Sequence, residues 1–184
     1  NIKLYFMLGL PTETRADLES ILDLCLKVKK QANSKRALIT AAISPFVPKA
    51  HTPFQWQAQI GLQEIRERID FLKSLFKPYK GLKLRWHQPE MSYLEGVFSR
   101  GDRQLGPVIV RAYELGDVLT SWTDQFNLQI WERAFEESGI DSNSYLQKKD
   151  EQADLPWEHI NSGLRKSFLQ AELRRALQEK FSSD

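Results

Sequence analysis

The sequence lacks several features that mark particular classes of protein. It holds one cysteine, Cys25, among 184 residues, so it forms no internal disulfide and no cysteine-rich zinc or iron–sulfur site of its own. It shows no secretory signal and no apolar run near the roughly 18 residues of a membrane-spanning helix. We therefore expect a cytoplasmic protein with no membrane partner.

A strong charge of either sign is also missing. Lys and Arg number 26 and Asp and Glu number 24, a net charge of +2, whereas a protein that coats DNA carries a large basic excess. Hydrophobic residues make up 41% and charged residues 27%, as in an ordinary globular domain. The chain begins without methionine, at Asn1, directly in an apolar run. We therefore expect it to be part of a longer protein.

The first part of the chain has the pattern of two strands joined by a helix. Residues 3–8 and 37–43 are short apolar runs, and apolar residues between them recur at helical spacing. The crossover rule makes the two strands parallel, as a βαβ unit. Because the first run does not alternate, it is typical of a strand covered on both faces.

The remaining pattern is mostly helical. A long loop over 46–59 is followed by a helix over about 62–76 and by one further short strand over 82–86. A polar stretch over 148–154 is the best internal linker. Helical spacing continues over residues 91–98, 105–115, 128–135 and 164–181. We expect an α/β part over residues 1–80 and a helical region over residues 81–184.

A parallel pair of strands is not stable alone, because it exposes both edges and much apolar surface. Three arrangements would cover it. The chain is the end of a larger parallel sheet or barrel, its helical region folds over the sheet, or it oligomerises. The missing methionine favours the first.

The strongest motif lies where the first strand ends, in Leu4-Tyr5-Phe6-Met7-Leu8-Gly9-Leu10-Pro11-Thr12-Glu13-Thr14. A buried strand leads into a helix N-terminus, where free N–H groups gather and Gly9 allows a ligand to approach the backbone. Pro11 fixes the turn, and Glu13 either caps the helix or accepts hydrogen bonds from a ligand. A tight turn without a ligand explains the same residues.

A second motif leaves the carboxyl end of the next strand, in Ile43-Ser44-Pro45-Phe46-Val47-Pro48-Lys49-Ala50-His51-Thr52-Pro53-Phe54. Phe46 and Val47 have the shape to pack on a flat ring, and Lys49 and His51 suit an anion or a proton transfer. Taken alone, the motif favours a proline-stiffened crossover with solvated Lys49 and His51.

Together the two motifs resemble the last two strand ends of a radical S-adenosylmethionine (SAM) barrel. The resemblance runs over nearly the whole chain and is most specific downstream. There it resembles an uncharacterised subfamily that usually carries a cobalamin-binding-like domain ahead of the barrel. The downstream matches are Gln55-Trp56, Glu64-Ile65-Arg66-Glu67-Arg68, Ser92-Tyr93-Leu94-Glu95-Gly96-Val97-Phe98-Ser99-Arg100-Gly101-Asp102-Arg103 and Leu155-Pro156-Trp157-Glu158-His159-Ile160-Asn161-Ser162-Gly163.

The resemblance implies an α/β fold, the C-terminal βαβ end of a (β/α)6 partial TIM-type barrel followed by a mostly helical accessory region. It also implies S-adenosylmethionine and a [4Fe–4S] cluster, which together generate a 5′-deoxyadenosyl radical, and it leaves the use of cobalamin open. By this analogy the cofactor-binding residues near the methionyl or ribose part are Gly9, Pro11 and Glu13. The backbone of Phe46 and Val47 would lie near the adenine, and Lys49 and His51 are candidates to line the substrate mouth.

The sequence departs from the family at the cluster. The family needs three cysteines in a Cys-x-x-x-Cys-x-x-Cys pattern, whereas Cys25 lies on the apolar stripe of a helix and reads as a small buried hydrophobe. We therefore assign no catalytic and no metal-binding residue, and we expect the chain alone to be inactive. Its expected partners are the missing N-terminal part of the same protein and an unknown substrate.

The alternative is a stand-alone helical module that binds RNA or protein without catalysis, which leaves nucleic-acid binding open. Aromatic residues would stack on bases, although aromatics at helical spacing are more often core. The segment Arg100-Gly101-Asp102-Arg103 would bind an anion or, as we favour, form a solvated helix break. A third interpretation is the end of another α/β barrel. The aromatic candidates are Tyr93, Trp122, Trp131, Tyr145 and Trp157.

Overall fold

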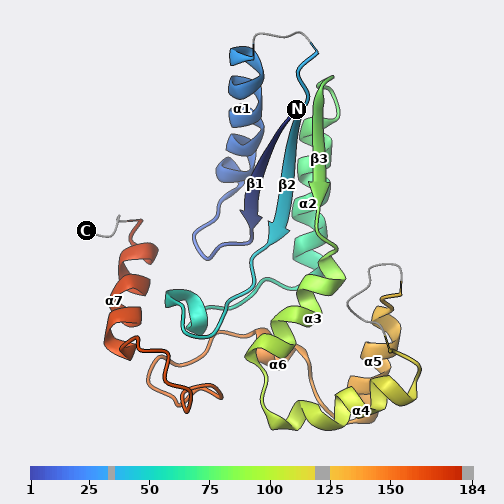
Figure 1. Cartoon of the computed structure of the whole chain (residues 1–184), viewed down its shortest axis with the longest axis vertical. Coiled ribbons are helices and arrows are strands. Elements are labelled where there is room, and N and C mark those ends of the chain that lie inside the picture. The colour runs from blue at the N-terminus through green and yellow to red at the C-terminus, as the bar shows by residue number, and fades with distance from the viewer. Residues whose placement is uncertain (33–35, 119–124, 180–184) are drawn as a thin grey trace. The chain divides into compact units, whose positions relative to one another are not determined.

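The computed structural model describes residues 1–32, 36–118 and 125–179 (Figure 1). The chain forms two compact units. Unit 1 comprises residues 1–46 and 60–92, and unit 2 comprises residues 47–59 and the chain from residue 93 onward. Trp122 and the last residues of the helix expected over 164–181 lie outside the described residues.

Unit 1 is built on a parallel sheet. The strands β1 (Ile2–Leu8), β2 (Ile39–Pro45) and β3 (Leu82–Trp86) pair in the order β1-β2-β3, all parallel. The helices α1 (Arg15–Gln31) and α2 (Leu62–Phe76) connect them. The expected βαβ unit is confirmed, and the short run over 82–86 is a third strand of the same sheet.

Both helices pack against one face of this sheet. The strand side chains of the core are Leu8, Ile39, Ala41, Ile43 and Leu82, and they meet the apolar stripes of α1 and α2. This follows from the topology, because successive right-handed crossovers that advance in one direction place their helices on the same side. Cys25 is fully buried in this core, as its position on the apolar stripe predicts.

The opposite face of the sheet is uncovered in the described residues. Tyr5 is 75% exposed and Met7 is 56% exposed, whereas Leu8, on the helix side, is fully buried. The expectation that the first strand is covered on both faces is therefore wrong for this structure. The apolar run is continuous in sequence, but alternate side chains point to opposite faces and only one face has helices on it.

Unit 2 is helical. The segment 47–59, expected to be a loop, contains the short 3-10 helix η1 (Pro53–Trp56), and α3 (Pro89–Arg100) starts in unit 1. The expected helix over 105–115 begins as 3-10 turn η2 (Arg103–Leu105). The other helices are α4 (Gly106–Glu114), α5 (Leu128–Glu137), α6 (Asn143–Leu146) and α7 (Lys166–Leu177). No helix in the described ranges is long and apolar enough to cross a bilayer.

The aromatic residues of unit 2 serve mainly as core. The ring of Trp131 meets Phe98 edge to face, with centroids 5.1 Å apart. Trp56 and Trp157 belong to a second buried cluster, with leucines from α7 and the preceding loop. Tyr93 is also buried. Packing therefore explains these side chains, as their helical spacing suggests, and leaves them little surface for stacking on bases.

Arg100 is the largest departure from expectation in unit 2. Its side chain is 1% exposed, and it donates to the carbonyl oxygens of Tyr145 at 2.8 Å, Gln147 at 2.6 Å and Gln57. Burial lowers the pKa of the guanidinium to about 10. The segment that begins at Arg100 is therefore not simply a solvated helix break, because its first side chain joins two separate stretches of backbone, one at Gln57 and one at Tyr145–Gln147.

Candidate functional site

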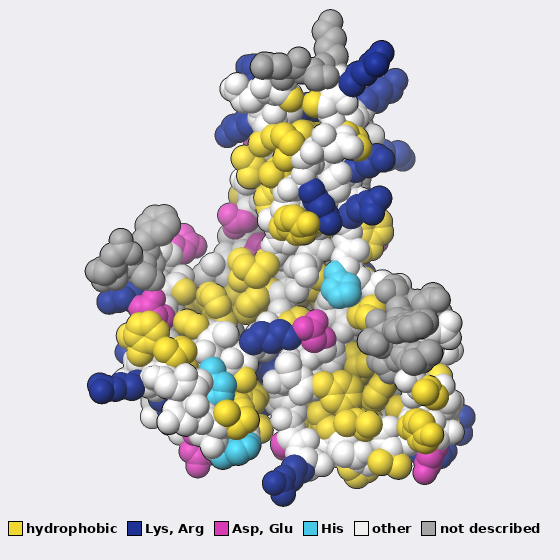
Figure 2. Space-filling model, in the orientation of Figure 1, with side chains coloured by type: hydrophobic (Ala, Val, Ile, Leu, Met, Phe, Trp, Pro, Cys, Tyr) yellow, Lys and Arg dark blue, Asp and Glu magenta, His cyan; other side chains and the backbone are white. Residues whose placement is uncertain are grey.

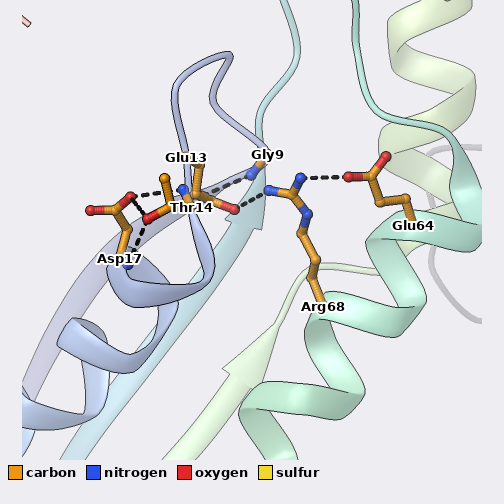
Figure 3. Close-up of polar contacts among 6 residues, drawn as sticks. All are labelled: Gly9, Glu13, Thr14, Asp17, Glu64 and Arg68. Carbon is orange, nitrogen blue, oxygen red and sulfur yellow. Dashed lines mark hydrogen bonds and ion pairs between the residues drawn. The ribbon is translucent and has the colours of Figure 1, made fainter.

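The turn between β1 and α1 carries the first predicted motif (Figure 3). The N–H of Gly9 donates to Glu13 Oε2 at 2.9 Å. Gly9 has φ +91°, and a Cβ at this position would lie 2.6 Å from Cδ1 of Ile60. Within this structure, glycine is required by the turn conformation and by the Ile60 side chain that packs on it.

Glu13 holds this turn to α2. Its side chain is only 5% exposed, and the oxygen that does not bind Gly9 accepts from Arg68, which also binds Glu64 (Figure 3). The two carboxylate oxygens thus already have partners within unit 1. A carboxylate has about four acceptor sites, so Glu13 retains lone pairs beyond these two contacts.

The helix cap is a different residue from the one predicted. Thr14 is the N-cap of α1: its side chain accepts from the N–H of Asp17, and the Asp17 carboxylate accepts from the N–H of Thr14 at 2.7 Å. The Thr14 hydroxyl also donates to the Asp17 carboxylate at 2.7 Å, and this bond, followed by the one from the Thr14 N–H, lowers the pKa of Asp17. The suggestion that Glu13 caps the helix is therefore wrong, because this reciprocal capping box occupies the N-terminus.

The second predicted motif is divided between the units. Phe46 directly follows β2 in unit 1, and its N–H donates to the carbonyl of Leu8 at 2.7 Å. This bond brings Phe46 beside the residue that precedes Gly9. Val47, Lys49 and His51 belong to unit 2. Of the predicted cofactor-binding residues, Gly9, Pro11, Glu13 and Phe46 thus lie at the carboxyl edge of the sheet.

The two substrate-lining candidates have partners or constraints of their own. Lys49 forms an ion pair with Glu95. His51 has φ +56°, and its N–H donates to Gln55 Oε1 at 3.0 Å. The same oxygen accepts from Trp157 Nε1 at 2.7 Å. His51 Nε2 is buried without a hydrogen-bond partner among the described residues, and the side chain lines a hollow of about 300 Å³ in unit 2.

Sequence reasoning missed the uncovered face of the sheet. The register places Lys3, Thr40 and Lys83 in one row across the strands, and Tyr5, Ala42 and Arg85 in the next. A hollow of about 340 Å³ lies on this part of the sheet, lined by Lys3, Tyr5, Ala42, Ile43, Ser44, Arg85, Trp86 and His87. The alternation of β3 could have indicated this face, because its charged residues Lys83 and Arg85 lie on the same side of the strand.

Ligands for a metal do not gather within the described residues. No group of three or more His, Cys, Asp or Glu side chains there is arranged to hold an ion. Burial raises the pKa of the Cys25 thiol, which disfavours the thiolate that metals bind. The candidate site consists of the carboxyl edge of the sheet, where the predicted cofactor-binding residues lie, and of the uncovered face, which carries the hollow.

Comparison with known proteins identifies an uncharacterised relative but does not assign a family. The chain is 26% identical over 145 residues to an uncharacterised protein of Methanocaldococcus jannaschii. The matched region covers 79% of this chain and 31% of the relative, so the chain spans about a third of that protein's length. No family model and no solved structure matches the chain.

Proposed function

We propose that unit 1 is the C-terminal part of the (β/α)6 barrel of a radical SAM enzyme. In the proposed whole protein, it helps to position S-adenosylmethionine and closes one side of the substrate mouth. The cluster ligands belong to another part of that protein, because the one cysteine here is buried in a hydrophobic core. The helical unit 2 would cover the open side of the barrel or recognise the substrate.

One observation carries the proposal: the sheet advances in a single direction and, among the described residues of unit 1, has helices on one face only. Parallel sheets are ordinarily buried on both faces. A sheet that winds back and forth gains helices on both sides, whereas a barrel encloses its inner face within its own curvature. An uncovered face that carries Tyr5 and Met7 fits the inner surface of a barrel.

The position of the motifs also supports the proposal. Ligands of α/β barrels bind at the carboxyl ends of the strands. Gly9, Glu13 and Phe46 meet at that edge through the bonds of the β1–α1 turn and the Phe46–Leu8 bond. Arg68 of α2 binds Glu13 in this turn, so the backbone of the turn is held in place without a ligand.

The residues of this chain fit the binding of S-adenosylmethionine but not the ligation of the cluster. The exposed Pro11 turn and the backbone around Phe46 would hold the cofactor beside the sheet edge. When bound next to a reduced cluster, S-adenosylmethionine would supply the group that abstracts a hydrogen atom from the substrate. The contribution of this chain is to hold the cofactor and exclude water from one side of the mouth, and it supplies no cluster ligand.

The deciding experiment uses the longest reading frame that contains this chain. We expect an upstream Cys-x-x-x-Cys-x-x-Cys segment, and a protein that takes up a [4Fe–4S] cluster under anaerobic reconstitution. Adding S-adenosylmethionine should change the electron paramagnetic resonance spectrum of the reduced cluster. A Pro11→Gly variant should weaken this response, with Pro78→Gly as a control at an exposed position after α2. A full-length protein without the cysteines, or with a cluster insensitive to the cofactor, contradicts the proposal.

A further inference from the structure

The uncovered face of the sheet carries cations and no acidic residue. At the strand positions that face away from the helices lie Lys3, Tyr5, Met7, Thr40, Ala42, Ser44, Lys83 and Arg85. Figure 2 looks onto this face, where Lys and Arg side chains stand beside hydrophobic ones. Within the described ranges, Lys3, Lys83 and Arg85 form no ion pair. Lys3 Nζ instead lies 4.7 Å from the centroid of the Tyr5 ring.

The register brings these charges within reach of one small ligand. Neighbouring strands lie about 4.8 Å apart, so residues on β1 and β3 in one row are separated by roughly 10 Å. Lys3 and Lys83 flank Thr40, and Tyr5 and Arg85 flank Ala42. The small side chains of the central strand form a floor, and the longer ones on the outer strands form walls around the hollow of about 340 Å³.

Charge and shape together indicate the ligand. Three cations within about one Debye length of each other repel unless an anion lies between them. A phosphate monoester carries close to two negative charges at neutral pH, which matches this set better than a single carboxylate. Arg85 offers the planar fork that binds phosphate oxygens in pairs, Ser44 and His87 add hydrogen-bonding atoms, and the exposed Tyr5 ring offers a flat apolar surface.

We propose that this face binds a small molecule that carries a phosphate monoester and an aromatic or heterocyclic ring. Lys3 and Arg85 hold the phosphate, and the ring lies on Tyr5 above Ala42. That this molecule is the substrate rests on the proposed function, since only a barrel makes this face the interior of an active site. The binding itself requires unit 1 alone.

The test measures binding of adenosine monophosphate to the 184-residue chain by titration calorimetry, with adenosine as the uncharged comparison. We expect saturable binding that weakens with added salt, no measurable binding of adenosine, and competition by inorganic phosphate. Arg85→Gln and Lys3→Gln should each weaken binding at least about tenfold, because each removes a charged hydrogen bond. Lys30→Gln, an exposed position on α1, is the matched control and should bind like the parent. Ala42→Leu should weaken binding by filling the floor.

Circular dichroism of each variant shows whether it is folded. Equal binding of adenosine and its phosphate, unchanged binding by folded Arg85→Gln, or binding of RNA oligonucleotides without binding of the mononucleotide would overturn the inference. These results do not depend on a cluster, so a failure here leaves the radical SAM proposal standing. A full-length protein without a cluster would in turn leave the phosphate site standing.

Discussion

Arg100 in unit 2 and Arg85 in unit 1 lie in opposite environments. In unit 2, Arg100 is buried and binds three backbone carbonyls, while in unit 1 Arg85 is exposed and has no acidic partner in the described part of the chain. A buried cation must have its donors satisfied, or it costs several kcal/mol. Arg100 therefore holds structure together, whereas Arg85 keeps all of its donors for a ligand. Acidic residues of unit 1 differ in the same way, because Glu13 is buried and holds structure together whereas Glu64 is exposed. The two faces of β1 differ likewise, since one packs on the helices and the other is exposed.

The largest expected effect comes from Arg100→Met. Removing the guanidinium leaves three carbonyl oxygens without a donor, so we expect a loss of about 3–5 kcal/mol from the free energy of unfolding of unit 2. Urea denaturation followed by tryptophan fluorescence measures it, because Trp56, Trp131 and Trp157 belong to unit 2. The matched variant Arg85→Met should change stability by less than about 0.5 kcal/mol. Equal losses in the two variants would break the comparison.

Glu13→Ala should have the next largest effect. The change removes the acceptor for the Gly9 N–H and the partner of the half-buried Arg68, at an expected cost of about 2–3 kcal/mol. Glu64→Ala removes the exposed partner of the same arginine and should cost less than about 1 kcal/mol. Chemical denaturation of both variants gives the difference. A similar cost for both would mean that the turn does not depend on the buried carboxylate.

The two faces of β1 provide a third test. Phe6 packs against the helices, so Phe6→Ala should lower stability by about 2–3 kcal/mol. Tyr5 is exposed, and Tyr5→Ser in this chain should change stability by less than about 0.5 kcal/mol. In the proposed whole protein, enclosure in a barrel would raise the cost of Tyr5→Ser to about 2 kcal/mol. A cost that stays near zero there argues against a barrel interior.

Local patterns were sufficient to predict the elements of unit 1. The apolar runs around β1 and β2 and the helical spacing between them depend on neighbours in sequence, and the parallel pairing follows from chain connectivity. The turn at Gly9 was also recognisable, because a glycine and Pro11 directly follow the strand, although the positive φ of Gly9 was not itself predicted. These features therefore needed no knowledge of distant contacts.

Features that depend on distant contacts were not predictable. Tyr5 is apolar enough to suggest burial, yet its exposure depends on which side both crossover helices take. Arg100 lies in a charged segment, and its burial depends on carbonyls near residues 57 and 145 that no local pattern connects to it. The division of the second motif between units after Phe46 is likewise a property of the packed chain.

The smallest expected effect concerns an exposed charge cluster in unit 2. Glu137 binds Arg111 of α4 and Arg133 of its own helix, and hydrogen bonds to these side chains, that to Arg111 most, lower its pKa. The folded state thus favours the ionised carboxylate. This contribution to stability is present above the ordinary glutamate pKa near 4.5 and is lost as the pH falls through the lowered value. Compared with the parent, Glu137→Gln should be slightly less stable at neutral pH and should lose less stability between pH 5 and 3, as measured by thermal melts. Identical pH dependence in the two proteins would show that this exposed cluster, unlike the buried Arg100, contributes nothing measurable to the fold.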